Sequence, residues 1–174
     1  TAFAKLLQAA GVDFAILGRD EKCCGDSARR TGNEYLYYTL AKENLETFRA
    51  HGIRRIVTCC AHGYNTLANE YRQLGGDFYE VKHHTELLAE LVAAGRLHFA
   101  DDSLPTVCYH DPCYLARWNG QTQAPRALLG SVRGLELREM EAHGDEALCC
   151  GGGGGRMWME EALDQRVGEL RAAL

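Results

Sequence analysis

The chain has 174 residues, a net charge of −5, a pI near 5.8 and 46% hydrophobic residues, so it can bury a core without disulfide staples. The acidic balance excludes the basic surface that nucleic-acid binding requires. No stretch is apolar for long enough to cross a bilayer, and Thr1 opens no secretory signal. We therefore expect a cytoplasmic domain, at the cytoplasmic face of the membrane if other parts of a longer protein attach it there.

The first half of the chain predicts helices and strands in alternation. Gly11 and Gly52 follow the first two helical patterns and end them. Tyr35, Tyr37 and Tyr38 are interpreted as packing residues of the second helix. The expected elements are a helix at 2–10, a strand at 12–17, a helix at 28–51, a strand at 53–58, a helix at 64–74, a strand at 78–81 and a helix from 83 to 94.

Turn residues at 101–105 mark the best internal boundary, so the expected domains are 1–103 and 104–174. Beyond this boundary the order recurs as a strand at 106–109, a helix around 124–129, a strand at 135–140, a glycine loop at 149–155 and a helix at 157–174. Alternating strands and helices predict an α/β fold with a mainly parallel sheet and flanking helices. The cysteine loops follow strands, and parallel sheets place ligands at the C-terminal ends of their strands.

Eight cysteines form the main chemical signal, at positions 23, 24, 59, 60, 108, 113, 149 and 150. Neighbours in sequence rarely reach disulfide geometry, and a glycine after a cysteine pair opens backbone conformations that let both thiols approach one site. One such pair alone could equally be two small buried hydrophobic side chains. Two Cys-Cys-Gly sequences and a third cysteine pair favour reduced thiols that bind metal.

The two halves also match each other, each reading as helix, strand, Cys-Cys-Gly loop and helix. Cys60 follows Cys24 by 36 positions, and Cys149 follows Cys113 by 36 positions. This spacing predicts two pseudo-repeated, Rossmann-like halves that are both truncated. The first unit would open with a cysteine about thirteen positions before Thr1, and the second would close near position 186.

Four segments resemble the cysteine-rich CCG domain of the heterodisulfide reductase catalytic subunit and its iron–sulfur relatives: residues 23–35, 64–71, 110–115 and 149–161. The similarity extends over nearly the whole chain. It is strongest to the oxidoreductases that pass electrons from electron-transfer flavoprotein to menaquinone. The resemblance implies a fragment of an oxidoreductase whose partners are other iron–sulfur or flavoprotein subunits or domains.

The resemblance also implies a non-cubane [4Fe-4S] cluster in each unit of the full protein. The implied ligands are Cys23, Cys24 and Cys60 in the first unit and Cys113, Cys149 and Cys150 in the second. Gly63 departs from the family pattern, because it stands where a Cys-x-x-Cys sequence would place a further ligand. Zinc, or no metal, stays open for the fragment alone, since thiolates also bind zinc.

The expected function is therefore electron transfer through iron–sulfur clusters, from a flavoprotein donor toward a quinone or a disulfide. Two alternatives stay open: a structural zinc-binding or subunit-docking domain without turnover, and a cysteine-dependent thiol/disulfide oxidoreductase. The sequence identifies no catalytic residue.

Other residues have simpler interpretations. Cys59 and Cys108 lie in apolar strands and are expected to be buried thiols without a metal. His110 is expected to form a hydrogen bond in the turn before Pro112, with a ligand role as the alternative. His83 and His84 are expected to cap or pack against a helix. The glycine run at 151–155 lacks the lysine of a phosphate-binding loop.

Overall fold

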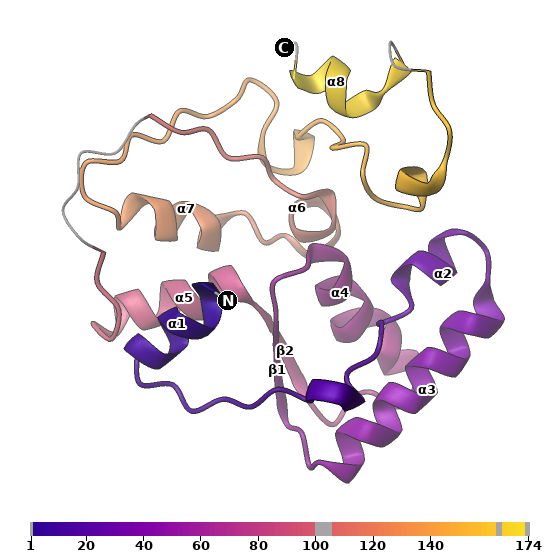
Figure 1. Ribbon diagram of the computed structural model, residues 1–174. Helices are drawn as coiled ribbons and strands as arrows, with labels where there is room; N and C mark the ends of the chain where they lie inside the picture. The colour runs from indigo at the N-terminus through magenta and orange to yellow at the C-terminus, as the bar shows by residue number, and fades with distance from the viewer. Residues whose placement is uncertain (1, 100–105, 163–164, 173–174) are drawn as a thin grey trace.

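The computed structural model describes residues 2–99, 106–162 and 165–172, with a small parallel sheet among surrounding helices (Figure 1). Strand β1 (Arg55–Thr58) pairs with β2 (Glu80–His83) so that Arg55 lies opposite Glu80 and Thr58 opposite His83. A parallel pair needs a crossover of a dozen or more residues, and helical segments between the two strands supply it. The molecule therefore has the predicted α/β character.

The crossover consists of α4 (Ala61–Asn65), a π-helical turn at Thr66–Glu70 and a 3-10 turn at Tyr71–Leu74. In helix α5 (His84–Ala93), the Glu86 side chain accepts a hydrogen bond of 2.8 Å from the His83 N–H and so satisfies an amide at the helix start. The other described helices are α1 (Ala2–Ala9), α2 (Asp26–Arg30), α3 (Glu34–Ala50), α6 (Cys113–Asn119), α7 (Gln123–Gly130) and α8 (Val167–Ala172), with 3-10 turns at Gly18–Asp20, Gly144–Glu146 and Arg156–Trp158.

Two apolar clusters form the core. The larger one joins α3 to the crossover and β2 through Tyr37, Ala41, Leu45, Phe48, Leu67, Tyr71 and Tyr79. The smaller one joins α1 to α5 through Leu7, Ala10, Leu88, Leu91 and Leu97, and Leu128 of α7 packs against it. Each buried leucine stabilises the fold by about 1.5–3 kcal/mol. The larger cluster packs beside the first cysteine loop. The smaller cluster packs where the two halves of the chain meet.

The long helix predicted at 28–51 is two helices, α2 and α3, separated at residues 31–33. Asn33 caps α3 by accepting a hydrogen bond of 3.0 Å from the Leu36 N–H, and this local interaction starts a new helix. Tyr37 is buried as predicted, but Tyr35 and Tyr38 are exposed. The prediction that all three tyrosines pack inward was therefore wrong for two of them.

Fewer strands form than the sequence predicts. Residues 12–17 are not a paired strand, and the strands expected at 106–109 and 135–140 reduce to one parallel bridge between Val107 and Leu137. A strand forms only where a neighbour accepts its backbone hydrogen bonds. One small sheet and one bridge among the described residues support the α/β class but do not confirm two Rossmann-like halves.

The C-terminal part differs most from expectation. A single helix over 157–174 was wrong, because the described residues there form a 3-10 turn at Arg156–Trp158 and the short α8. Helix α6, in contrast, was not predicted. It begins at Cys113, directly after Pro112, which is the N-cap residue and has extended backbone.

The two halves pack against each other. The Asn69 side chain donates a hydrogen bond of 2.7 Å to Asn119, and Asn119 donates one of 3.1 Å to Asn65. The boundary predicted at 101–105 lies outside the described residues. None of the described helices has the length and apolar character that crossing a membrane demands.

Candidate metal centres

The first Cys-Cys-Gly loop is shaped by Gly25, which caps α2 with a φ of 82°. This left-handed conformation favours glycine, and a Cβ at Gly25 would lie 3.0 Å from the Tyr37 ring. The Gly25 N–H donates a hydrogen bond of 3.4 Å to the Cys23 Sγ. The glycine thus turns the chain and brings an amide to a thiol sulfur.

Side chains of the core fix the carbonyl groups of this loop. The Asn44 Nδ2 donates a hydrogen bond of 2.9 Å to the Cys23 carbonyl, and the Tyr71 hydroxyl donates one of 3.0 Å to the Cys24 carbonyl. Asn44 and Tyr71 are buried and also bond to each other at 3.0 Å. Tyr71 is part of the larger apolar cluster, and Asn44 is bonded to it. The packed core therefore holds the backbone of the two cysteines.

The third predicted ligand of the first unit lies near the other two. Cys60 precedes α4, and its Sγ accepts a hydrogen bond of 3.4 Å from the Gly63 N–H. Burial is the main cause that raises the pKa of the Cys24 thiol to about 11, and charge on Cys23 and Cys60 adds to it. Cys23, Cys24 and Cys60 are therefore brought within electrostatic range of one another, and we call them the first triad.

His62 modifies one thiol of the first triad. A hydrogen bond with the His62 side chain lowers the pKa of Cys60, against the opposing effect of burial. On its other side, the His62 Nε2 has no hydrogen-bond partner among the described residues. A Cβ at Gly153 would lie only 2.5 Å from this nitrogen. The glycine run of the second unit therefore packs directly against the first unit.

The position of Gly63 is consistent with the family's further ligand. A Cβ added there would lie 3.9 Å from the Cys60 Sγ and 3.4 Å from the Thr58 Oγ1, which are ordinary contacts. A Cβ at position 63 would therefore lie beside Cys60 without a clash.

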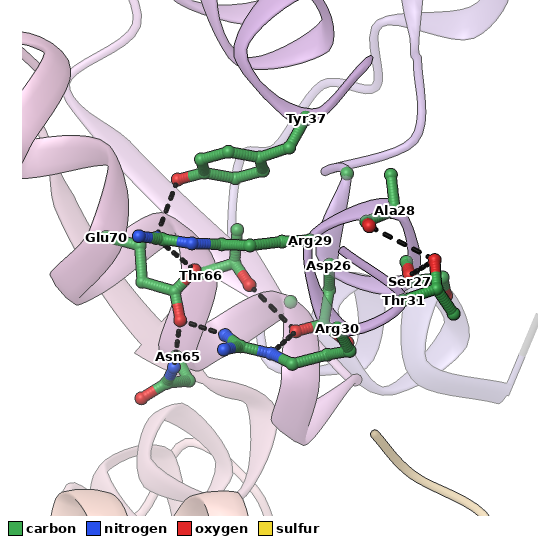
Figure 2. A network of polar contacts seen from close by, with 12 residues as sticks. Asp26, Ser27, Ala28, Arg29, Arg30, Thr31, Tyr37, Asn65, Thr66 and Glu70 are labelled. Carbon is green, nitrogen blue, oxygen red and sulfur yellow. Dashed lines mark hydrogen bonds and ion pairs between the residues drawn. The ribbon is translucent and has the colours of Figure 1, made fainter. Parts of the chain in front are cut away.

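A partly buried charge network joins α2, which follows Cys24 and Gly25, to the π-helical turn (Figure 2). Figure 2 shows Arg29 and Arg30 of α2 directed at one carboxylate, that of Glu70 in the π-helical turn. The Arg29 Nη1 lies 2.8 Å from the Glu70 Oε2, the Arg30 Nη2 contacts the Glu70 Oε1, and the Arg30 Nε lies 3.0 Å from the Asp26 Oδ1. The network ties the helix after Gly25 to the crossover after Cys60.

The second unit repeats the hydrogen bonds of the first. Gly151 has a φ of 77°, and its N–H lies 3.4 Å from the Cys149 Sγ. The Gly152 N–H lies 3.4 Å from the Cys150 Sγ. Burial raises the pKa of Cys113, the first residue of α6, and charge on Cys149 and Cys150 adds to the effect. Cys113, Cys149 and Cys150 form the second triad.

Polar side chains, rather than an apolar core, hold the second loop. The His110 Nε2 is 2.9 Å from the Leu148 carbonyl oxygen, which confirms the hydrogen-bonded interpretation of this histidine. The Arg117 Nε donates a hydrogen bond of 2.5 Å to the Asp145 carbonyl, and its Nη2 donates one to the Ala147 carbonyl. The loop backbone just before the second triad is fixed from two sides.

Asp111 anchors this arrangement from a buried position, with 1% of its side chain exposed. Its two carboxylate oxygens accept hydrogen bonds of 2.8 and 2.7 Å from Arg126, and the Gly144 N–H donates one of 2.7 Å. Burial alone would raise the pKa of Asp111, but the bonds from Arg126 and Gly144 bring it below its ordinary value. Sequence reasoning missed Asp111 and Arg126, although Asp111 precedes Pro112 and Cys113.

The remaining cysteines stay outside both triads. Cys59 and Cys108 are exposed, so the prediction that they are buried thiols was wrong. Cys59 directly follows β1 and Cys108 directly follows the bridge residue Val107, so neither lies inside a strand that a sheet could cover. His83, in contrast, caps α5 and is buried, as predicted.

The donor chemistry of both triads fits an iron–sulfur cluster, because each offers cysteine thiols that accept backbone N–H groups. Across residues 2–99, 106–162 and 165–172, no three His, Cys, Asp or Glu side chains converge tightly enough to hold a single metal ion. The described thiols therefore lie near one another without forming a closed single-ion site.

Comparison with known proteins matches this cysteine pattern. The chain is 51% identical over 160 residues to the EtfAB:quinone oxidoreductase of Syntrophomonas wolfei, covering 92% of the chain and 22% of the relative. It is 34% identical over 175 residues to one subunit of the dihydromethanophenazine:CoB–CoM heterodisulfide reductase of Methanosarcina barkeri, covering 98% of the chain and 43% of that subunit.

A third relative, from Chromohalobacter salexigens, is named "Probable membrane-anchored ferredoxin" and is 44% identical over 174 residues, covering 98% of the chain and 26% of the relative. The chain thus spans less than half the length of each of these relatives. No solved structure matches it. The model of the cysteine-rich domain family CCG matches residues 1–68 and 107–174, which are most of the chain and include all six triad cysteines. The chain belongs to the cysteine-rich CCG domain family.

Proposed function

We propose that the chain is an electron-transfer domain of a larger oxidoreductase, in which each cysteine triad binds one iron–sulfur cluster. The expected domains, 1–103 and 104–174, are then the two cluster-binding units. The observation that carries this proposal is the recurrence of one arrangement at two places: three thiols within electrostatic range, with glycine N–H groups bonded to their sulfurs. When bound, such a cluster supplies one-electron transfer.

A cluster rather than zinc is supported by the glycine N–H groups that lie against thiol sulfurs in both triads, since such hydrogen bonds tune iron–sulfur clusters. Thiolates also bind zinc, so the metal content of the protein distinguishes the two. We propose the non-cubane [4Fe-4S] type on the family resemblance, with Cys23, Cys24 and Cys60 on one cluster and Cys113, Cys149 and Cys150 on the other.

Thiol/disulfide exchange has less support. The nucleophile in that chemistry is a thiolate with a lowered pKa. Burial, aided by neighbouring charge, raises the pKa of Cys24 to about 11 and also raises the pKa of Cys113. Cys60 alone has a lowered pKa among the triad cysteines with a resolved shift, because of His62. This alternative therefore depends on Cys60, and it predicts that Cys60 alkylates far faster than the others.

The names of the relatives suggest the direction of electron flow. We propose that a reduced flavin in a partner flavoprotein supplies two electrons, one at a time. The acceptor is a quinone, which takes two electrons and two protons to become a quinol, or a disulfide, which takes the same number to become two thiols. We propose that other parts of the full protein bring this domain to the membrane face, and the name of the membrane-anchored relative supports this.

Reconstitution of the full-length protein with iron and sulfide tests the proposal. We expect a visible absorption band, an EPR signal on oxidation or reduction, and iron with acid-labile sulfide bound to the protein. A colourless protein with stoichiometric zinc would overturn the redox function. As a control, zinc is added to the reconstituted protein. Retention of the colour shows that zinc does not displace the iron–sulfur cluster.

A further inference from the structure

The second unit contains a parallel backbone bridge that has no counterpart among the described residues of the first unit. In the second unit, the Val107 N–H donates a hydrogen bond of 2.9 Å to the Glu136 carbonyl, and the Arg138 N–H donates one of 2.8 Å to the Val107 carbonyl. These bonds form the parallel bridge between Val107 and Leu137. Val107 lies six positions before Cys113, the opening cysteine of its unit.

The first unit contains a segment equivalent to residues 136–138, but this segment forms no bridge with another described residue. Gly11 and Gly134 both follow a helix and have positive φ, 62° and 80°, so they align the segments after them. Phe14 then corresponds to Leu137, and Asp13 and Ala15 to Glu136 and Arg138. No backbone hydrogen bond joins residues 13–16 to another described residue.

The space beside residues 13–16 is a groove of about 580 Å³ with apolar and charged lining. Its lining includes residues 12–16, residues 54–57 of β1 and its approach, and Phe3 and Leu7 of α1, and it extends to Glu80 and Lys82 of β2 and Glu90 of α5. Three apolar side chains of this lining are exposed: Phe14 by 37%, Ile16 by 80% and Val57 by 36%. Side chains of this kind are expected to be covered in the complete fold.

One edge of β1, a strand whose residues line this groove, has no strand beside it among the described residues. The Glu80 N–H of β2 donates a hydrogen bond of 2.8 Å to the Arg54 carbonyl. Alternate residues of a parallel strand bond to the same neighbour, so the backbone groups of Arg55 and Val57 face away from β2. The sheet of the described residues contains β1 and β2 only, and leaves those groups without a strand.

We propose that a parallel strand from the segment preceding Thr1 in the full-length protein inserts into this groove, between residues 13–16 and β1. It is the counterpart of residues 106–113, so its bridging residue lies about nineteen positions before Thr1. The residue donates to the Asp13 carbonyl and accepts from the Ala15 N–H on one side, and it pairs with Val57 on the other. Both strand pairings of the described residues are parallel, which sets its direction.

The insertion gives the sheet the strand order 2-1-3-4, counting the inserted strand as the first, residues 12–17 as the second, β1 as the third and β2 as the fourth. In this order the crevice for a ligand lies at the C-terminal ends of the first and third strands. The opening cysteine follows the first strand, and Cys59 and Cys60 follow the third. If the proposed function holds, this placement completes the first triad with a fourth thiol; the strand pairing itself does not depend on metal.

Amide hydrogen exchange in the full-length protein, with the iron content of the same sample measured, tests the insertion. We expect slow exchange at Ala15, Leu17, Arg55 and Val57, and fast exchange at Phe14 and Ile16, whose amides face away from the inserted strand. Slow exchange at Ala15 with fast exchange at Val57 would overturn the insertion in favour of an outer edge strand. Fast exchange at both would overturn the pairing altogether.

Two proline variants provide a matched comparison. Ala15→Pro removes an N–H that bonds to the inserted strand, so exchange at Val57 should become faster by about a hundredfold. Ile16→Pro removes an N–H that faces away and should leave Val57 unchanged. Equal effects of the two variants would contradict the register. The iron content tests the proposed cluster, and the exchange pattern tests the inserted strand. A sample without iron that shows the expected exchange pattern would contradict the cluster and support the strand.

Discussion

The two triads carry the same Cys-Cys-Gly turn but rest on different supports. Buried Asn44 and Tyr71, next to an apolar cluster, hold the carbonyls of the first loop. His110 and Arg117, with Asp111 and Arg126 beneath them, hold the second, and Leu148 beside it is 42% exposed. One motif can therefore be positioned by packing or by charge. We expect the second unit to be the more sensitive to loss of a charged group.

The largest effect is expected for Asp111→Ala, which leaves Arg126 partly buried without its main partner. Removing one member of a buried ion pair costs about 3–5 kcal/mol, and the lower value applies here because Glu139 still binds Arg126 at 2.7 Å. Urea unfolding of the full-length protein measures the free energy. Glu43→Ala, which removes an exposed pair with Lys22, should cost less than about 1 kcal/mol. Equal losses would contradict the special role of charge in the second unit.

Acid should weaken the two units in different pH ranges. Burial, with the nearby charge of His84, lowers the pKa of His83 to about 4. Because the unfolded histidine titrates near 6.5, its contribution is full above about pH 6.5 and is lost as the pH falls toward 4, by about 3 kcal/mol. The pKa of Asp111 is lowered, so its contribution is full above about pH 3.9 and is lost only below that value.

Unfolding free energies at pH 7, 5 and 3 measure this difference. Burial also lowers the pKa of His84, so His83→Gln should reduce the decline between pH 7 and 5 and leave the decline below pH 4. An unchanged decline between pH 7 and 5 in His83→Gln would show that His83 is not responsible.

Glu70→Gln is expected to have a smaller effect, about 1.5–3 kcal/mol, because it weakens charge-assisted hydrogen bonds to two arginines. Glu34→Gln is a matched control, since Glu34 also binds Arg29, at 3.3 Å, but is 65% exposed. Its cost should stay below about 0.5 kcal/mol. Thermal or urea unfolding distinguishes the two, and similar values would show that the charge network between α2 and the π-helical turn contributes little.

The smallest change in stability is expected for Gly63→Cys, within about 0.5 kcal/mol, because a Cβ there makes only ordinary contacts. The new thiol faces Cys60, so iron should leave the first unit more slowly when a chelator is added. Gly63→Ser adds a side chain of similar size that is a poor cluster ligand, and it should not slow the loss. Equal rates in the two variants would mean that position 63 does not reach the cluster.

Much of this architecture follows from local sequence signals. Helix periodicity and glycine positions predicted α1, α5 and α7, and the apolar run at 53–58 predicted β1. The spacing of 36 residues and the family resemblance led to two groups of cysteines, and in the structure the charges of Cys23 and Cys60 act on Cys24 and those of Cys149 and Cys150 act on Cys113. These features depend on neighbours in sequence or on a repeat that the sequence displays.

Other features depend on distant partners and were not predictable. Residues 12–17 have a strand sequence but lack a neighbour, and strand formation requires one. The break between α2 and α3 comes from the Asn33 cap, which competes with continuous apolar spacing. Asp111 and Arg126 lie fifteen positions apart and meet only in the folded chain. No periodicity in the sequence reports such a pair.

The central claim is that the two triads bind separate clusters, and a redox titration followed by EPR tests it most directly. In the full-length protein, Cys24→Ala should remove the iron and the signal of the first cluster only, and Cys150→Ala those of the second only. Cys108→Ala, outside both triads, should retain both. The account would be contradicted if either triad variant kept all of its iron, or if both variants lost the same signal.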